Sequence, residues 1–179
     1  LCIHEWALTT PDFNTDIDYQ VTRGEAYQLL TDRPDNRRPL TWERNRIDIL
    51  IMEGQVFRCP WTRKRIYEGV SYDIDHLFPF SVYPMNELWN LVPTDRRYNQ
   101  HTKRDRVPKL ERLRQEEPIL GDTYQSYGQQ DELAVALRED VKLRFANISL
   151  DKPDFEERVA SATIGFLDEI ADYRNLQRF

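Results

Sequence analysis

The chain has 179 residues, of which 40% are hydrophobic, and this suits one domain of ordinary size or a small catalytic module with a helical annex. The sequence has no long apolar run, which excludes a membrane span, and no signal peptide is visible. Two widely separated cysteines, Cys2 and Cys59, exclude a disulfide framework, so we expect a protein of the reducing cytoplasm.

The formal net charge of −6 is unevenly distributed along the chain. Residues 54–115 contain 12 Lys and Arg against 7 Asp and Glu, whereas the rest of the chain contains 13 against 24. A locally basic segment with acidic surroundings is the pattern expected of a phosphate-binding surface.

Residues 1–53 are predicted to be mostly helical. Because the chain opens with Leu1 rather than Met, we expect it to be a segment of a longer protein. A short helical stretch is predicted at residues 25–31, and a longer helix from the cap candidate Thr41 to a stop at Gly54, with Trp42 in the core.

Three short strands are predicted next. Residues 55–59 and 65–67 form a hairpin around a cationic turn, and residues 72–78 alternate with period two, so we expect one small antiparallel layer. Pro79 removes a backbone donor and should end the third strand, which leaves His76 near its exposed end.

Adjacent residues of a strand point to opposite faces, and this applies to Asp75 and His76. One of them can bind a cation while the other contacts a water molecule. A carboxylate suits a hard divalent cation, and an imidazole suits proton abstraction at cellular pH.

A helix is predicted after Pro93, with Thr94 as the capping residue. Its spacing puts Asp95, Asn99 and Lys103 on one face, four residues apart. Asn99 could then point its amide oxygen at a metal ion held by Asp75, with Lys103 one turn further on, where a phosphate would lie.

The remainder, residues 109–179, is predicted to be helical, at residues 109–116, 131–145 and 155–176, with a turn at residues 118–122. Tyr124 and Tyr127 lie in a Gln-rich stretch that we interpret as a surface linker; stacking on nucleic acid is the alternative.

The motif Tyr72-Asp73-Ile74-Asp75-His76, followed by Asn90 and, nine positions later, by Asn99, resembles the HNH endonucleases with the ββα-metal fold. The variant is the one with Asn as third letter, similar to the HNH domains of CRISPR effector nucleases and bacterial restriction-like proteins. The resemblance covers roughly residues 56–108. It implies an α+β fold in which a small ββα-metal nuclease module, residues 54–108, is embedded in a mostly helical domain.

Carried over to this chain, the resemblance makes His76 the general base and makes Asp75 and Asn99 the ligands of one Mg²⁺ or Mn²⁺ ion. Asn90 is expected to bond across the loop and so hold the backbone and ring of His76. The literal third-letter histidine, His101, diverges from the Asn99 face; we expect it beside the metal ligands rather than among them, where it could contact a phosphate.

The nucleic-acid contacts expected on this basis are phosphate contacts, which add affinity without sequence information, and they come from Arg96, Arg97 and Lys103. Arg63 and Lys64 either approach the DNA backbone or belong to a solvated turn. Asp73 is either a neighbour supporting Asp75 or a solvated side chain.

Many HNH nucleases carry two Cys-x-x-Cys knuckles around a structural zinc ion, and here the chain departs from the family. In Cys59-Pro60-Trp61-Thr62, Thr62 stands where the second cysteine of a knuckle would be. Two cysteines cannot supply four thiolates, so we expect no structural zinc and a small buried thiol at Cys59.

The sequence therefore predicts a metal-dependent endonuclease that cuts DNA, either double-stranded or as a displaced single strand. One alternative is a catalytically inactive nucleic-acid-binding module. Another is a nuclease arm that works only with other subunits of a bacterial defence or CRISPR-type complex. No membrane partner is expected.

Overall fold

The structure is a computed structural model that describes residue 8, residues 22–31 and residues 40–179. The chain divides into two units, Leu1–Arg38 and Pro39–Phe179, and each is described by itself. Leu1 and Cys2, on which two expectations depend, lie outside the described residues. The predicted module boundaries near residues 53 and 108 both fall inside the second unit.

Helix α2 of the first unit spans Arg23–Thr31 and begins with a capping box. The Thr22 hydroxyl accepts a hydrogen bond from the backbone N–H of Glu25 at 3.3 Å, and the Glu25 carboxylate accepts one from the backbone N–H of Thr22 at 2.9 Å. The helix predicted at residues 25–31 is confirmed, with a start slightly earlier in the chain.

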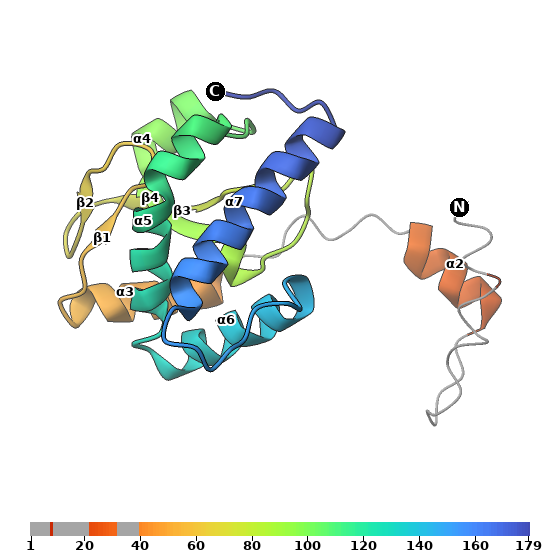
Figure 1. Cartoon of the computed structure of the whole chain (residues 1–179), viewed down its shortest axis with the longest axis horizontal. Helices are drawn as coiled ribbons and strands as arrows, with labels where there is room; N and C mark the ends of the chain where they lie inside the picture. Colours follow the sequence, from red (N-terminus) through yellow and green to blue (C-terminus); the bar gives the residue numbers. More distant parts are fainter. Residues whose placement is uncertain (1–7, 9–21, 32–39) are drawn as a thin grey trace. The chain divides into compact units, whose positions relative to one another are not determined.

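The second unit contains four strands and a set of helices, and Figure 1 shows their arrangement. The strands are β1 (Phe57–Arg58), β2 (Arg65–Ile66), β3 (Tyr72–His76) and β4 (Leu91–Asp95). The helices are α3 (Thr41–Met52), the 3-10 turn η1 (Leu88–Asn90), α4 (Arg96–Tyr98), the π-helical turn η2 (Asn99–Lys103), α5 (Leu110–Tyr127), α6 (Asp131–Arg144) and α7 (Phe155–Tyr173). The predicted α+β class is confirmed. Within the described ranges, no helix is both long and apolar enough to cross a membrane.

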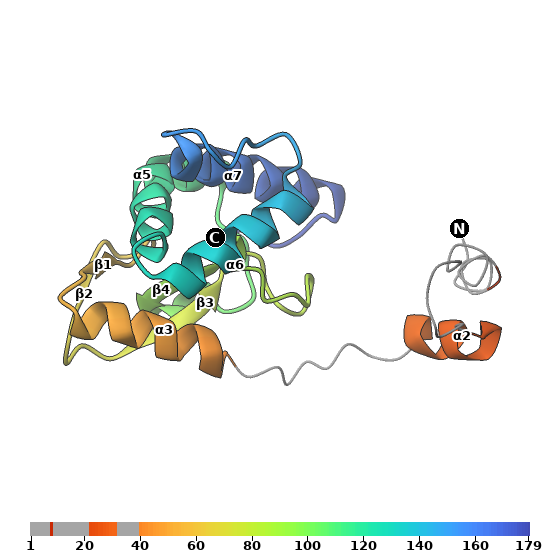
Figure 2. The same ribbon diagram turned by 90° about the horizontal axis from the view of Figure 1, so that it is seen from below.

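Strands β3 and β4 lie between helix α3 on one side and helix α5 on the other, with α7 packed beside α5 (Figure 2). The Tyr72 hydroxyl of β3 donates to Asp48 of α3 at 2.6 Å. On the other side, the Tyr127 hydroxyl of α5 donates to the carbonyl of Leu91 in β4 at 2.8 Å. The short strands are therefore fixed from both sides by helices.

The four strands form two separate antiparallel pairs rather than one predicted layer. Strand β1 pairs with β2, as the hairpin prediction requires, but β3 pairs with β4, whose strand character was not predicted. Pro93 of β4 lies opposite Ile74, although proline has no backbone N–H to donate and usually interrupts a strand. It is tolerated because a two-stranded sheet leaves one side of each strand without a partner in the ladder.

Helix α5 runs without interruption through Pro118, so the predicted turn at residues 118–122 is wrong. A proline inside a helix costs roughly 3 kcal/mol. Here the cost is offset by burial, because Leu113 and Leu120 on either side of Pro118 are fully or almost fully buried, as are the two tyrosines at the end of the helix.

These tyrosines, Tyr124 and Tyr127, were predicted to lie in a surface linker or to stack on nucleic acid, and both expectations are wrong. Each side chain is 0% exposed. The Tyr124 hydroxyl donates to the carbonyl of Trp89 at 2.6 Å, two residues from the Leu91 carbonyl that Tyr127 binds. Burial raises the pKa of both phenols, so they remain hydrogen-bond donors.

The core of this unit is rich in aromatic rings. Trp89 is fully buried and packs edge-to-face against Phe145 at 5.3 Å and Phe166 at 5.5 Å between ring centroids. Cys59 is fully buried, as predicted, whereas Trp42, predicted to lie in the core, is 41% exposed.

Replacing Tyr124 by Phe tests whether the hydroxyl of this helix supports the segment before β4. The substitution leaves the Trp89 carbonyl without this donor in a dry environment, and we expect the free energy of unfolding to fall by about 1–2 kcal/mol in denaturant titrations. Tyr173→Phe is the matched control because Tyr173 is 87% exposed, and its stability should not change. Equal stabilities of the two variants would contradict the structural role.

Candidate active site

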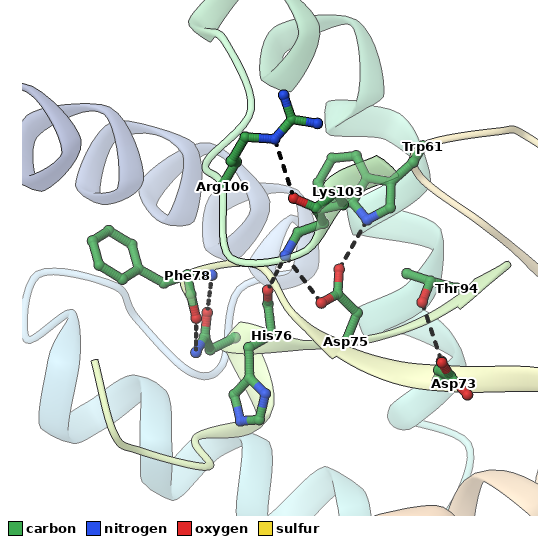
Figure 3. A network of polar contacts seen from close by, with 9 residues as sticks. Trp61, Asp73, Asp75, His76, Phe78, Thr94, Lys103 and Arg106 are labelled. Carbon is green, nitrogen blue, oxygen red and sulfur yellow. Dashed lines mark hydrogen bonds and ion pairs between the residues drawn. The ribbon is translucent and has the colours of Figure 1, made fainter. Parts of the chain in front are cut away.

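Asp75 and His76 occupy the last two positions of β3, opposite Val92 and Leu91 of β4. Figure 3 shows the imidazole ring of His76 pointing away from the carboxylate of Asp75, as expected for neighbouring residues of a strand. The strand ends here, so the prediction of His76 near its end is confirmed.

The Asp75 carboxylate is buried, and both of its oxygens accept hydrogen bonds (Figure 3). The Lys103 ammonium donates to Oδ1 at 3.0 Å, and the Trp61 indole N–H donates to Oδ2 at 3.0 Å. Burial raises the pKa of Asp75, and the charge of Lys103 opposes that shift. These two donors keep a charged carboxylate tolerable in a buried position.

Lys103 does not lie where a phosphate contact was predicted. Its side chain is 1% exposed, and its ammonium donates to the His76 carbonyl at 2.8 Å in addition to Asp75. The physical reason is the π-helical turn η2, closed by a bond from the Arg104 N–H to the Asn99 carbonyl at 2.9 Å. A π turn contains more residues than an α turn, so the four-residue spacing no longer keeps Lys103 on the predicted face.

Asp95 also departs from the predicted face. It is the N-cap of α4, a position predicted for Thr94, and its carboxylate accepts from the Tyr98 N–H at 2.9 Å and from Lys64 at 2.5 Å. The Lys64 hydrogen bond is the main cause that lowers the pKa of Asp95. This carboxylate starts the short helix instead of facing Asn99.

Asn99, Asp75 and His76 nevertheless line one surface pocket of about 410 Å³, together with Lys103 and Arg104. Within residues 40–179 the structure gives the Asn99 carboxamide no hydrogen-bond partner, so its oxygen is available to a ligand. The structure thus brings together the end of β3 and the turn η2, which lie more than twenty positions apart in the sequence.

The ring of His76 is held from the loop that follows β3. Its Nε2 lies 2.9 Å from Oδ1 of Asn86, and its ring packs against Phe80 at 5.1 Å between centroids. Burial lowers the pKa of His76, and the hydrogen bond to Asn86 partly opposes this. The neutral imidazole, which is the form able to accept a proton, is therefore favoured near pH 7.

Asn90 is fully buried, and its side chain bonds across the loop, which is how it was predicted to hold His76; its partner there is the backbone of Phe78. Its Oδ1 accepts from the Phe78 N–H at 2.7 Å, and its Nδ2 donates to the Phe78 carbonyl at 3.4 Å. The backbone carbonyl of Asn90 also accepts from the Leu77 N–H at 2.8 Å. The amide clamps the chain immediately after His76 and so fixes where β3 ends.

Most of the predicted nucleic-acid contacts are engaged in ion pairs within the protein. Arg96 pairs with Asp73 at 2.9 Å, Arg63 pairs with Glu116 at 3.0 Å, and Lys64 pairs with Asp95. Asp73 also accepts from Gln100 at 3.0 Å, so it anchors the α4–η2 segment to β3.

Arg97 is exposed, and within the described residues its guanidinium has no ion pair. With Lys64 and His101 it lines a second pocket of about 570 Å³. His101 lies on the divergent face that the sequence predicted, but it does not line the pocket of Asp75 and Asn99, beside which it was expected.

Two residues of the site were missed by the sequence analysis. Trp61 lies in a turn that was interpreted for its cations and for the missing knuckle cysteine, and Asn86 lies in an irregular loop ten positions after His76. Neither position belongs to a periodic pattern. Their contacts with Asp75 and His76 follow from the path of the chain, so no local signal pointed to them.

Replacing Lys103 by Met tests the buried ion pair. Asp75 would keep only the Trp61 donor, and we expect a loss of about 3–5 kcal/mol in the free energy of unfolding, measured by denaturant titration. Lys64→Met is the matched control: it breaks another Lys–Asp pair whose lysine is 68% exposed, and it should cost at most about 1 kcal/mol. Similar losses in the two variants would argue against the structural importance of the buried pair.

Comparison with models of protein families gives a match to part of the chain. The model of the HNH endonuclease family matches residues 59–109, less than a third of the chain, and the matched segment includes Asp75, His76, Asn90 and Asn99. No curated protein and no solved structure matches the chain. Proteins of this family act on nucleic acids and generally use a divalent metal ion. Residues 59–109 of this chain are an HNH endonuclease domain.

Proposed function

We propose that this chain is a metal-dependent endonuclease that hydrolyses phosphodiester bonds of DNA, with His76 as the general base. One observation carries the proposal: Asp75 and His76, at the end of β3, line the same pocket as Asn99 of the turn η2. The family match to residues 59–109 supports the reaction class, and the basic balance of residues 54–115 supports a phosphate-containing substrate.

The donor set of the pocket fits a single Mg²⁺ or Mn²⁺ ion, which Asp75 and Asn99 would hold. Both supply oxygen atoms, and Mg²⁺ is usually bound by one or two carboxylates together with water and substrate phosphates. Within the described ranges no three His, Cys, Asp or Glu side chains gather around a point that could hold a metal ion. A cation here therefore depends on the carboxamide of Asn99 and on oxygens from water and substrate.

The residues of the chain divide the chemistry between them. Neutral His76 accepts a proton from a water molecule as the water oxygen attacks phosphorus, while the bond between phosphorus and the 3′ oxygen breaks. The cation, when bound, neutralises charge that develops on the phosphoryl group and on the departing oxygen. Asn90 holds the end of β3 by its two bonds to Phe78, so that the base keeps its place relative to Asp75.

For the substrate backbone we propose contacts by Arg97 and Lys64, with Arg96 and Arg63 as further contacts. Arg97 needs no rearrangement, because it is exposed and without an ion-pair partner in the described part of the chain. The other three would have to release their ion-pair partners within the protein: Asp95 for Lys64, Asp73 for Arg96 and the buried Glu116 for Arg63. The buried ammonium of Lys103 stays with Asp75.

A plasmid-nicking assay of the chain with Mg²⁺, Mn²⁺ or EDTA tests the reaction. We expect cleavage that requires the cation and falls by at least about a hundredfold in His76→Ala, the low end for loss of a general base. His101→Ala is the comparison variant, and its loss should be much smaller because His101 lines the other pocket. Equal cleavage by the wild type and His76→Ala would contradict the assignment.

A specific observation favours a second candidate, a catalytically inactive nucleic-acid-binding module. Lys103 and Trp61 already occupy both oxygens of Asp75, as they would in a domain that keeps the fold without the metal ion. This candidate is favoured if the wild type and His76→Ala bind DNA equally and neither cleaves it with any cation tested.

The DNA contact is tested by the salt dependence of binding to a short duplex, measured by fluorescence anisotropy with Ca²⁺ or EDTA to prevent cleavage. For Arg97→Ala we expect weaker binding and a log-log salt slope smaller by about one. Arg158→Ala, an exposed arginine of the acidic C-terminal region, serves as the control and should leave the slope unchanged. A slope that changes equally in both variants would show a general charge effect.

A setting in a larger bacterial defence or CRISPR-type protein, with other subunits as partners, is a further proposal. It is supported only by the resemblance of roughly residues 56–108, and no contact among the described residues adds to it. Co-purification with the products of neighbouring genes tests it.

A further inference from the structure

The contact between Asn86 and His76 joins the candidate base to a part of the chain with no assigned role. Asn86 Oδ1 and His76 Nε2 are 2.9 Å apart, and Asn86 is half-buried. The amide lies ten residues beyond the histidine, in the loop that connects β3 to η1. It differs from Asn90, whose amide binds only the backbone of Phe78.

The loop around Asn86 is anchored by helix α6, which lies outside the segment that matches the family. The neighbouring Glu87 is buried and accepts hydrogen bonds from Arg144 of α6 at 3.1 Å and from the Trp89 indole at 2.5 Å. The Leu88 N–H donates to Asp140 of α6 at 2.7 Å. Asn86 is thus carried by a segment tied down immediately after it, so its amide can hold the ring in one orientation.

The chemistry of the contact determines which ring nitrogen can accept a proton. A carboxamide oxygen only accepts hydrogen bonds, so His76 Nε2 must carry the proton, and Nδ1 then keeps its free electron pair. With the amide reversed, its N–H would donate to Nε2 and the proton would lie on Nδ1, leaving no free electron pair for the reaction. The orientation of an amide is inferred from its hydrogen bonds, and it can be tested through the histidine.

We propose that Asn86 is a positioning residue: its side-chain oxygen holds His76 in the tautomer protonated at Nε2, and the atom that takes the proton from water is Nδ1. This inference rests on the proposed function for its catalytic meaning. The hydrogen bond and the tautomer belong to the protein itself, so they can be measured whether or not the protein cleaves DNA.

The primary experiment is ¹⁵N NMR of the chain labelled at histidine, recorded well above pH 7, where the neutral ring dominates. The chain has three histidines, and the His76 signals are identified by their loss in His76→Gln. We expect the wild type to show His76 as the pure tautomer protonated at Nε2. A ring protonated at Nδ1 would overturn the proposal.

Variants at Asn86 separate positioning from folding. Asn86→Leu removes the acceptor and should give a mixture of the two tautomers, whereas Asn86→Asp keeps an acceptor oxygen and should restore the Nε2–H form. Asn147→Leu replaces an exposed asparagine and is the control, with no change expected at His76. A His76 tautomer that is the same in Asn86→Leu as in the wild type would overturn the proposal, and the wild-type spectrum decides even if this variant fails to fold.

Activity gives the second readout. In the nicking assay with Mg²⁺ we expect Asn86→Leu to lose at least about tenfold in kcat with little change in KM, as for the loss of a residue that orients a reacting group, and Asn86→Asp to recover part of it. Unchanged kcat in Asn86→Leu despite mixed tautomers would overturn the catalytic part. The expected tautomers together with no cleavage by the wild type would instead refute the proposed function and leave the hydrogen bond established.

Discussion

The buried ion pair between Asp75 and Lys103 is the interaction on which the geometry of the site depends. It joins the end of β3 to the end of η2, and the indole of Trp61 adds the turn after β1. Two charges removed from water are tolerated only when their hydrogen-bonding capacity is used, and here both carboxylate oxygens and two of the ammonium donors are engaged. Because Lys103 is fixed, the turn that carries Asn99 is held beside Asp75.

The same ion pair also affects how Asp75 could bind a divalent cation. In the structure its charge is balanced by an ammonium within the protein. A divalent ion at the same carboxylate would have to share it with Lys103 or displace it. Cation binding would therefore be coupled to the stability of the domain, because both depend on the partner of the buried Asp75 carboxylate.

The helices beyond the family-matched segment support the site rather than forming a separate annex. Tyr124 and Tyr127 of α5 bind the carbonyls of Trp89 and Leu91, at the start of β4. Helix α6 binds the segment around Glu87. The loop from His76 to Leu91 is therefore held from inside by Asn90 and from outside by two helices, which explains how a module with such short strands keeps a defined pocket.

Features that depend on neighbouring residues could be predicted from the sequence. These are the helices α3, α6 and α7, the strand β3, the position of His76 near its end, and the opposite directions of Asp75 and His76, because periodicity and residue spacing are local properties. The meeting of Asn99 with Asp75 in one pocket was expected from a motif.

Other features depend on contacts between distant parts of the chain and could not be predicted. Pro93 lies inside β4 because β3 pairs with that strand, and α5 continues through Pro118 because its two tyrosines are buried. Lys103 turns inward because a π turn changes the spacing, and Asn86 meets His76 because helix α6 holds the loop. No short stretch of sequence contains these pairings, since their free energy comes from surfaces that become neighbours only when the chain has folded.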